Sequence, residues 1–397
     1  MKVQKIFDSF MSSNIFNNKG VLQSNYTPET IPHRDKEIEQ IASILAPALR
    51  QERTSNLFVY GNTGTGKTLS IHYLKNELLK RSDKSPLRVE YLNCKLRKVA
   101  DTEYRILAEL IKKFGHEVPA TGLPTDQVYN KFIEVIEQEK QFIILILDEV
   151  DQIVKKMSDG FLYNLMRINT ELSKTQLSVI GISNDVTFLD NIDPRVRSSL
   201  SEEEIIFPPY NALQLQDILK TRAELAFKKN VVGEGVIAKC AAIAAREHGD
   251  ARRALDLLRV AGELTEREGL AKISLKYIDQ ANAKIEKDKI LSIIETEPKQ
   301  FQAVILAIIE LSDKNKDKIF TGEVYQVYQD VCKRARMEML TQRRIGDIIS
   351  EFDMLGLINA SVISKGRYGK TREIKLAISK QIIERAKKII NESLGFA

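Results

Sequence analysis

The spacing of hydrophobic residues divides the chain into an N-terminal part that mixes two patterns and a later part that is mainly helical. Before residue 211, short apolar runs alternate with stretches in which apolar residues recur every three or four positions. The runs are typical of buried strands and the stretches of amphipathic helices, so their alternation predicts an α/β fold with a parallel sheet. The predicted strands are residues 57–60, 87–94, 142–147, 177–182 and 204–207.

From residue 211 the strand signal stops, which indicates a domain boundary. Helices are expected over 211–229, 234–247, 250–268 and 274–294, and then over 301–311, 321–334 and 341–354. Two alternating strands, 357–364 and 372–378, follow, and three helices before a two-stranded ribbon are typical of a winged helix-turn-helix. We therefore expect an arm at 1–25, an α/β core at 26–210, a helical domain at 211–294 and a winged helix at 295–397.

A glycine-rich segment follows the first predicted strand. Residues 61–68 match G-x-x-x-x-G-K-[ST] and lead into a helical pattern, which is the context that a phosphate-binding loop needs. Glycines let the backbone N–H groups point at phosphate oxygens, Lys67 would contact the β- and γ-phosphates, and Thr68 would offer its hydroxyl to Mg²⁺. We expect ATP or ADP and Mg²⁺ to be bound here by Gly61, Asn62, Gly64, Thr65, Gly66, Lys67, Thr68 and Leu69.

Polar residues follow two of the later predicted strands. Asp148 and Glu149 come directly after the most apolar strand, at the edge where an open α/β sheet binds its ligand. We expect Asp148 to hold Mg²⁺, directly or through water, and Glu149 to orient and polarise the water that attacks the γ-phosphate. Asn184 follows the next strand and has two interpretations that the residues alone do not separate: contact with the γ-phosphate or its attacking water, or a cap of the next helix.

One arginine stands where a helix disfavours it. Gly249 and Asp250 predict the end of one helix and the N-cap of the next, which places Arg252 in a first turn. A cation there opposes the helix dipole. This local conflict indicates a functional role for Arg252, namely reaching across to a phosphate.

Positive charge in the last block is concentrated at the predicted hairpin tip. Residues 365–375 contain one acid, Glu373, and five basic residues: Lys365, Arg367, Lys370, Arg372 and Lys375. Such a tip would meet DNA phosphates or a minor groove, and the start of the third helix would meet base edges. The expected DNA-binding residues are Gln342, Arg343, Arg344, Lys365, Arg367, Tyr368 and Lys370. The alternative is a winged helix that docks protein and carries a solvated basic face.

Composition narrows the class of protein. With 397 residues and 43% hydrophobic residues, two or three domains with proper cores are expected, and a net charge of +6 is compatible with nucleic acid as a partner. The three cysteines are far apart and form no C-x-x-C, so neither a disulfide framework nor a zinc knuckle is indicated. Neither a signal-peptide core nor a run of ~20 apolar residues occurs, so we expect a cytoplasmic protein without a membrane partner.

Several strings together resemble the archaeal replication initiators, relatives of the largest origin-recognition-complex subunit and of the eukaryotic helicase-loading factor. They are Gly61–Thr68, Asp148–Asp151, Asn184, Asp193–Leu200, Phe207–Tyr210 and Gly249–Leu255. The resemblance extends from about residue 15 to the carboxyl terminus; the phosphate loop is common to many ATPases, and the longer strings with the winged helix are more specific. It implies an AAA+ core with sheet order 5-1-4-3-2, an α-helical lid and a C-terminal winged helix.

The resemblance also implies roles for individual residues. Asn184 matches sensor 1, and Arg252 matches sensor 2 on the lid. Tyr210 and Arg222 match positions that line the nucleotide between core and lid. Arg195 matches the arginine finger, which acts on nucleotide held by a neighbouring subunit, and Arg197 is close enough to leave the register open.

The implied function is that of an ATP-dependent initiator that binds origin duplex DNA through its winged helix and through an insertion around 95–125. It would help to recruit or load the replicative helicase, together with paralogous initiator subunits, as a monomer off DNA or an oligomer on it. Hydrolysis would be slow and act as a switch, and the protein would be cytoplasmic and nucleoid-associated. The alternatives are a clamp-loader-like or helicase-loader-like ATPase and a signalling, STAND-type ATPase whose winged helix docks protein.

Overall fold

The computed structural model divides the chain into two units, Met1–Ile278 and Asp279–Ala397. It describes residues 15–23, 26–82, 86–95, 102–119, 122–157, 159–200, 202–314, 319–364 and 370–396, and of Ser364, Lys370 and Gln381 only the backbone. One helix, α12 (Leu275–Thr296), crosses the boundary between the units.

A parallel sheet forms the centre of the first unit. Its strands are β1 (Leu57–Tyr60), β2 (Leu87–Asn93), β3 (Phe142–Asp148), β4 (Gln176–Ser183) and β5 (Glu203–Ile206). The order β2-β3-β4-β1-β5, with every neighbouring pair parallel, is the expected 5-1-4-3-2 read from the other edge. All five strands lie within two residues of their predicted bounds, which confirms the predicted α/β class.

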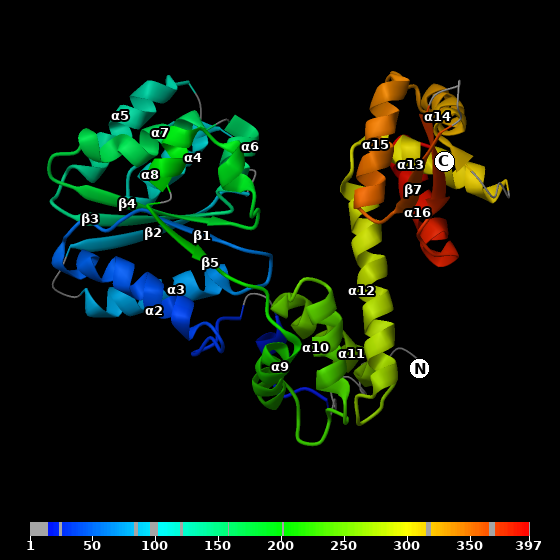
Figure 1. Cartoon of the computed structure of the whole chain (residues 1–397), viewed down its shortest axis with the longest axis horizontal. Helices are drawn as coiled ribbons and strands as arrows, with labels where there is room; N and C mark the ends of the chain where they lie inside the picture. The colour runs from blue at the N-terminus through cyan, green and yellow to red at the C-terminus, as the bar shows by residue number, and fades with distance from the viewer. Residues whose placement is uncertain are drawn as a thin grey trace. The chain divides into compact units, whose positions relative to one another are not determined.

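Helices cover both faces of this sheet (Figure 1). On one face lie α2 (Asp35–Leu45) and α3 (Lys67–Arg81); on the other lie α4 (Glu103–Lys113), α5 (Thr125–Ile136), α6 (Asp151–Met157), α7 (Gly160–Arg167) and α8 (Pro194–Leu200). The helices α6, α7 and α8 were not predicted, because helices of seven or eight residues are shorter than the window of about 11–18 residues in which a helical period is recognised.

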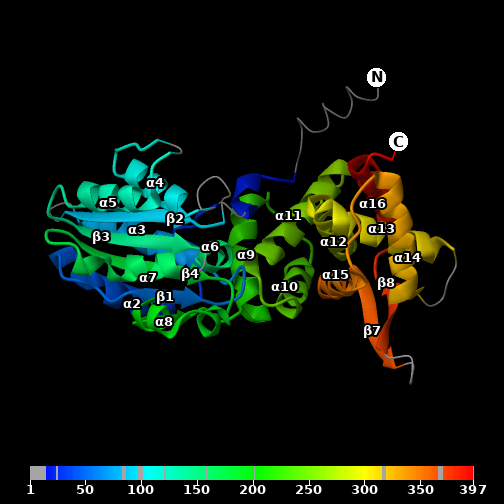
Figure 2. The same ribbon diagram turned by 90° about the horizontal axis from the view of Figure 1, so that it is seen from above.

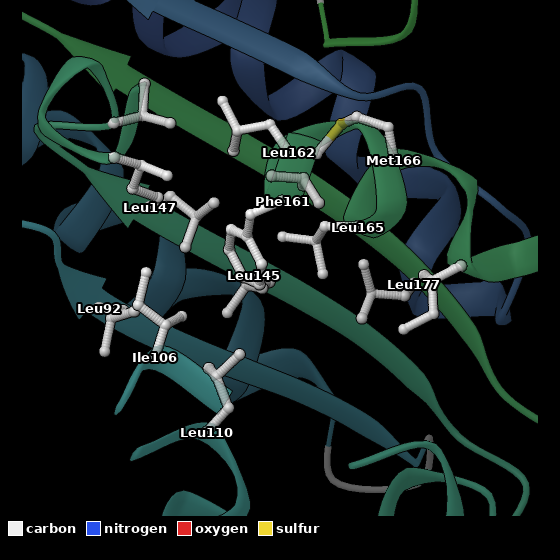
Figure 3. Close-up of a cluster of buried hydrophobic side chains, with 14 of the residues drawn as sticks. Leu92, Ile106, Leu110, Leu145, Leu147, Phe161, Leu162, Leu165, Met166 and Leu177 are labelled. Atoms are coloured by element: carbon white, nitrogen blue, oxygen red, sulfur yellow. The ribbon is translucent and has the colours of Figure 1, made fainter. Parts of the chain in front are cut away.

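The central strand β3 is buried along its whole length, and its side chains alternate between two cores. Ile144 and Ile146 pack with α2 and α3, whereas Leu145 and Leu147 pack with the helices of the opposite face. Figure 3 shows the second core, in which Leu145 and Leu147 meet leucines of α4 and α7. This packing fixes the carboxyl end of β3, where the predicted acids lie.

Helices α9 (Ala212–Ala226), α10 (Val236–Arg246) and α11 (Ala251–Arg267), with the start of α12, follow the sheet in the first unit. Asn211 opens α9 with a capping box to Gln214. The predicted arm is packed where it is described, since Ile15 is buried and the Phe16 ring stacks on Phe227 with centroids 4.9 Å apart. The rest of the predicted arm, residues 1–14 and 24–25, lies outside the described residues.

The second unit contains α13 (Lys299–Asp313), α14 (Thr321–Ala335), α15 (Gln342–Met354) and α16 (Lys380–Leu394), with β7 (Ile358–Ser364) and β8 (Lys370–Leu376) as an antiparallel ribbon (Figure 2). The prediction of a two-stranded ribbon is corrected by β6 (Ile319–Phe320), which pairs with β8 and makes the sheet three-stranded. A two-residue strand cannot show a period-two pattern. The C-terminal helix α16 was not predicted either; it packs into the hydrophobic core that α13, α14 and α15 form.

None of the helices in the described part of the chain combines the length and the apolar character that crossing a bilayer requires.

Candidate functional site

The loop between β1 and α3 has the backbone that a phosphate-binding loop requires. Gly61, Gly64 and Gly66 have φ angles of +149°, +68° and +95°, in the region that favours glycine. A Cβ at position 61 would lie 2.3 Å from the carbonyl oxygen of Phe207, so a larger residue would displace the backbone. Because α3 begins at Lys67, the loop ends at the positive end of a helix dipole.

The Lys67 side chain is buried at this loop. Its Nζ donates hydrogen bonds of 2.7 Å to the carbonyl oxygens of both Gly61 and Asn62. Burial lowers the pKa of Lys67 to about 8; the nearby Arg252 acts in the same direction, and Asp148 acts against both. A bound anion would favour the charged ammonium. The surroundings of Lys67 therefore fit the binding of a phosphate.

Three donors hold the carboxylate of Asp148 at the carboxyl end of β3. The hydroxyls of Thr68 and Tyr91 both donate to Oδ2, at 3.0 and 2.7 Å, and the backbone N–H of Glu149 donates to Oδ1 at 2.9 Å. Carboxylate and hydroxyl oxygens are ligands that Mg²⁺ accepts. Thr68 and Asp148, which the sequence predicts as Mg²⁺ ligands, thus lie in direct contact and fit that ion.

The predicted water-activating residue, Glu149, has an unusual backbone. Its φ is +55°, which is uncommon for a residue with a side chain. Its carboxylate forms an ion pair with Lys95, with Nζ and Oε2 3.5 Å apart. Glu149 therefore lies beside Asp148 at the same edge of the sheet, with its carboxylate turned to a lysine two residues after the end of β2.

Arg34, which the sequence analysis did not select, is almost completely buried beside the phosphate loop. Its Nε donates to the carbonyl oxygen of Thr65 at 2.8 Å, and its Nη2 donates to that of Pro208 at 2.5 Å. Its guanidinium lies 3.9 Å from the ring centre of Tyr210 and forms an ion pair with Glu37 at 3.2 Å. The residue precedes α2 and carries no motif, so nothing in the sequence marks it.

The helical domain that follows the sheet, where a lid is expected, contacts the phosphate-binding loop through the start of α11. Asp250 caps this helix, as predicted, and accepts a 2.7 Å hydrogen bond from the backbone N–H of Arg252. The N–H of Ala251 donates to the carbonyl oxygen of Gly64 at 3.2 Å, and Thr63 donates to the Asp250 carboxylate at 3.4 Å. A Cβ at position 64 would lie 1.7 Å from Oδ1 of Asp250, so this contact requires glycine.

The two residues expected to line the nucleotide have different surroundings. Tyr210 is buried, and its hydroxyl lies 2.9 Å from where a Cβ would stand at Gly66, so its ring adjoins the loop. Arg222 is also buried, but its guanidinium donates to the carbonyl oxygen of Val21 at 3.5 Å and lies 4.5 Å from the ring centre of Tyr26. These two contacts of Arg222 are with the arm and with the residue that directly follows it.

Asn184 is exposed directly after β4, and it does not cap the next helical turn, because the N-cap there is Thr187. This removes the capping interpretation. Arg195 is mostly exposed on α8, bonded to Asp193 at 2.9 Å. Arg197, on the same helix, forms an ion pair with Asp190 at 3.2 Å.

The predicted DNA-binding residues of the winged helix lie in the second unit. Thr341 caps α15, so Gln342, Arg343 and Arg344 form its first turn, and all three side chains are exposed. Arg372 of β8 donates to the carbonyl oxygen of Gly346 in α15 at 2.7 Å, which ties the ribbon to this helix. Residues 365, 367 and 368 lie outside the described residues, as does the side chain at 370; so do residues 97 and 98 of the predicted DNA-contacting insertion.

Family models match three parts of the chain. An AAA domain matches residues 50–186, a Cdc6 AAA+ ATPase-type lid domain matches 216–283, and a CDC6 C-terminal winged helix domain matches 292–386. These matches fall on the sheet unit, the helices after it and the second unit, respectively.

Relatives match nearly the whole chain. The ORC1-type DNA replication protein of Pyrococcus horikoshii is 51% identical over 386 residues, which are 96% of this chain and 91% of that protein. ORC1-type DNA replication protein 1 of Methanosarcina mazei is 48% identical and covers 98% of this chain and 92% of its own length. The Aeropyrum pernix ORC1 protein, solved in complex with DNA, is 41% identical with a TM-score of 0.85, over 95% of this chain and 97% of that one. The chain therefore belongs to the family of ORC1-type DNA replication proteins, with an AAA+ core, a lid and a C-terminal winged helix.

Proposed function

We propose that this chain is a replication initiator that binds duplex DNA at origins through its winged helix and uses ATP or ADP in the AAA+ core as a switch. The observation that carries the proposal is the match along 95% of the chain to an ORC1 protein solved in complex with DNA. The exposed polar first turn of α15 supports it, because the first residues of a recognition helix are those that meet base edges.

For the nucleotide, Lys67 would contact the β- and γ-phosphates, and the N–H groups of the glycine loop would complete the cradle. The hydroxyl of Thr68 and the carboxylate of Asp148 would hold Mg²⁺, whose charge neutralises phosphate oxygens when it is bound. Two observations support this assignment: the Lys67 ammonium is buried and donates hydrogen bonds to two carbonyl oxygens, and the Thr68 hydroxyl lies 3.0 Å from the Asp148 carboxylate.

For hydrolysis, Glu149 would orient and polarise the attacking water, Asn184 would contact the γ-phosphate or that water, and Arg252 would reach the nucleotide from the lid. The start of α11, which adjoins the loop at Gly64, supports the role of Arg252. Arg195 would act on nucleotide held by a neighbouring copy, and its exposure on α8 is compatible with that role. Turnover would be slow without this neighbour.

For DNA, Arg343 and Arg344 of α15 would contact bases and phosphates, and the ribbon would contact the adjoining backbone or groove. The segment around 95–125 would add a second contact from the core. Paralogous initiators and the replicative helicase are the proposed protein partners, and the nucleoid of the cytoplasm is the proposed location.

The nucleotide assignment is tested with Lys67→Ala. We expect the variant to lose ADP binding in calorimetry while the circular dichroism of the full chain and its affinity for duplex DNA without nucleotide are retained. Undiminished ADP binding by the variant would refute the assigned site.

The DNA assignment is tested by titrating the full chain with a short duplex at two salt concentrations. A chain that neutralises several phosphates should lose affinity steeply as salt rises, since counterion release drives the binding. Absence of duplex binding at low salt would instead favour a winged helix that docks protein.

A further inference from the structure

Tyr91 is a tyrosine of β2 whose hydroxyl reaches the carboxylate expected to hold Mg²⁺. β2 pairs in parallel with β3, and Asn93 of β2 lies opposite Asp148 of β3. Tyr91 is therefore two residues before the position on β2 that faces Asp148. Its hydroxyl donates to Oδ2 of Asp148 at 2.7 Å, which is shorter than the 3.0 Å bond from Thr68 to the same oxygen.

The carboxylate of Asp148 is held on both of its oxygens. Thr68 and Tyr91 donate to Oδ2, and the backbone N–H of Glu149 donates to Oδ1 at 2.9 Å. A carboxylate offers about four acceptor positions, so the described residues use three of them and leave one, on Oδ1. Rotation of the carboxylate would break at least one of these bonds, and its orientation is therefore fixed before any cation binds.

The ring of Tyr91 is itself fixed. His72 of α3 lies against it, with ring centroids 4.5 Å apart. α3 is the helix that begins with Lys67 and Thr68, so the same helix supplies one direct partner of Asp148 and the support for the other. A phenylalanine at position 91 would keep this ring contact and remove only the hydroxyl.

From this geometry we propose that Tyr91 is a positioning residue for the Mg²⁺ site: its hydroxyl orients the Asp148 carboxylate toward the ion and thereby sets how strongly Mg²⁺ increases nucleotide affinity. Partners that orient a metal ligand contribute to metal affinity although they do not touch the metal. The inference rests on the proposed nucleotide site, and it assigns to Tyr91 no contact with nucleotide.

The test measures ADP affinity by calorimetry in EDTA and at saturating Mg²⁺, for the full wild-type chain and for Tyr91→Phe. We expect the affinity in EDTA to stay within about twofold and the gain that Mg²⁺ provides to fall by about tenfold, at the lower end of the effect of losing such a partner. The Mg²⁺–ADP equilibrium in solution is the same for both proteins and does not affect the comparison.

A matched control is Tyr129→Phe. Tyr129 of α5 also donates its hydroxyl to a carboxylate, that of Glu171 at 3.2 Å, and it packs at the edge of the core of the same unit. We expect this variant to keep the wild-type gain from Mg²⁺. An equal loss in both variants would show a general effect of removing a hydroxyl and would overturn the proposal.

A second comparison shows whether Tyr91 acts through Asp148. In an Asp148→Asn background, Tyr91→Phe should have no further effect on the response to Mg²⁺. The proposal is overturned if Tyr91→Phe responds to Mg²⁺ as the wild type does, or if it still weakens the response in that background. If the wild-type chain itself gains nothing from Mg²⁺, the proposed Mg²⁺ site is what fails, and this result is distinct from the other two.

Discussion

Arg34 donates its Nε hydrogen to the carbonyl oxygen of Thr65 at 2.8 Å, and this bond joins a buried cation to the backbone of the phosphate loop. The same guanidinium donates to Pro208, after β5, and stacks on Tyr210, whose own N–H donates to Gly249 of the lid at 3.3 Å. A single side chain thus connects the loop with the segment that joins core and lid. Movement at that joint would act on the loop through these contacts.

Arg34→Lys should show how much this connection contributes. Lysine keeps the charge but lacks the planar guanidinium that here donates to Thr65 and Pro208 from two different nitrogens while it stacks on Tyr210, so a buried acceptor loses its donor. We expect a loss of about 2–5 kcal/mol in the free energy of unfolding and weaker ADP binding. Urea unfolding and calorimetry measure the two effects. Arg50→Lys is the control, since Arg50 is exposed; a variant of Arg34 as stable as this control would contradict the role.

Gly249 allows the lid to approach Tyr210. Its φ is +66°, and a Cβ there would lie 2.5 Å from the carbonyl oxygen of Tyr210. Gly269 has nearly the same φ, +69°, but a Cβ there would meet no described atom within 4 Å. Gly269→Ala should therefore cost only the left-handed strain, about 1–2 kcal/mol, whereas Gly249→Ala should cost about 1–3 kcal/mol more. Equal unfolding midpoints for the two variants would argue against the close approach.

The α/β core should contribute to acid sensitivity through Glu137. Burial raises the pKa of its carboxyl, but hydrogen bonds from Ser173, Lys174 and Thr175 outweigh burial and hold the pKa at about 2. The folded value lies below the usual value of about 4.3, so the stabilisation is present above that pH and is lost as pH falls toward 2.

Glu137→Gln should accordingly be less stable than the wild type at pH 7, by about 1–2 kcal/mol after allowance for solvent screening. The difference should shrink below pH 4 and vanish near pH 2. Urea unfolding at several pH values measures it, with the exposed Glu139→Gln as control. A difference that does not depend on pH would show that the charge of Glu137 is not responsible.

The start of α15 should carry sequence preference. Arg343 is exposed in its first turn, so Arg343→Ala is expected to weaken binding to an origin duplex by about 1–3 kcal/mol and to affect a scrambled duplex less. Lys388→Ala, on α16, removes a similar charge elsewhere in the second unit and should change neither. Equal losses on both duplexes would indicate phosphate contact without base readout.

The strands and the phosphate loop could be predicted because their signals are local. The strand before Gly61 and the helix from Lys67 are neighbours in sequence, and Asp148 is marked by the apolar strand that precedes it. The ribbon of β7 and β8 was also predicted, and with it the winged helix to which it belongs. β6 and α16 were not predicted, the first because it is only two residues long.

The contacts that complete the site could not be predicted, because they join distant parts of the chain. Tyr91 and Asp148 are 57 residues apart, and Arg34 and Pro208 are 174 apart. Only the pairing of β2 with β3 brings Tyr91 and Asp148 together. Arg34 could not be selected either, because the sequence around a buried arginine before a helix does not differ from that around an exposed one. Arg222 is a further example. Its contacts to Val21 and Tyr26 depend on how the N-terminal segment packs on α9, which the sequence does not show.

The proposed function joins a nucleotide-dependent AAA+ core to a winged helix that binds duplex DNA. Footprinting of the purified full chain on the genomic DNA of its own host, with ATP and with ADP, examines both parts in one experiment. We predict protection of discrete sites whose extent differs between the two nucleotides. Protection that is absent, or uniform along the DNA and the same with either nucleotide, would contradict it.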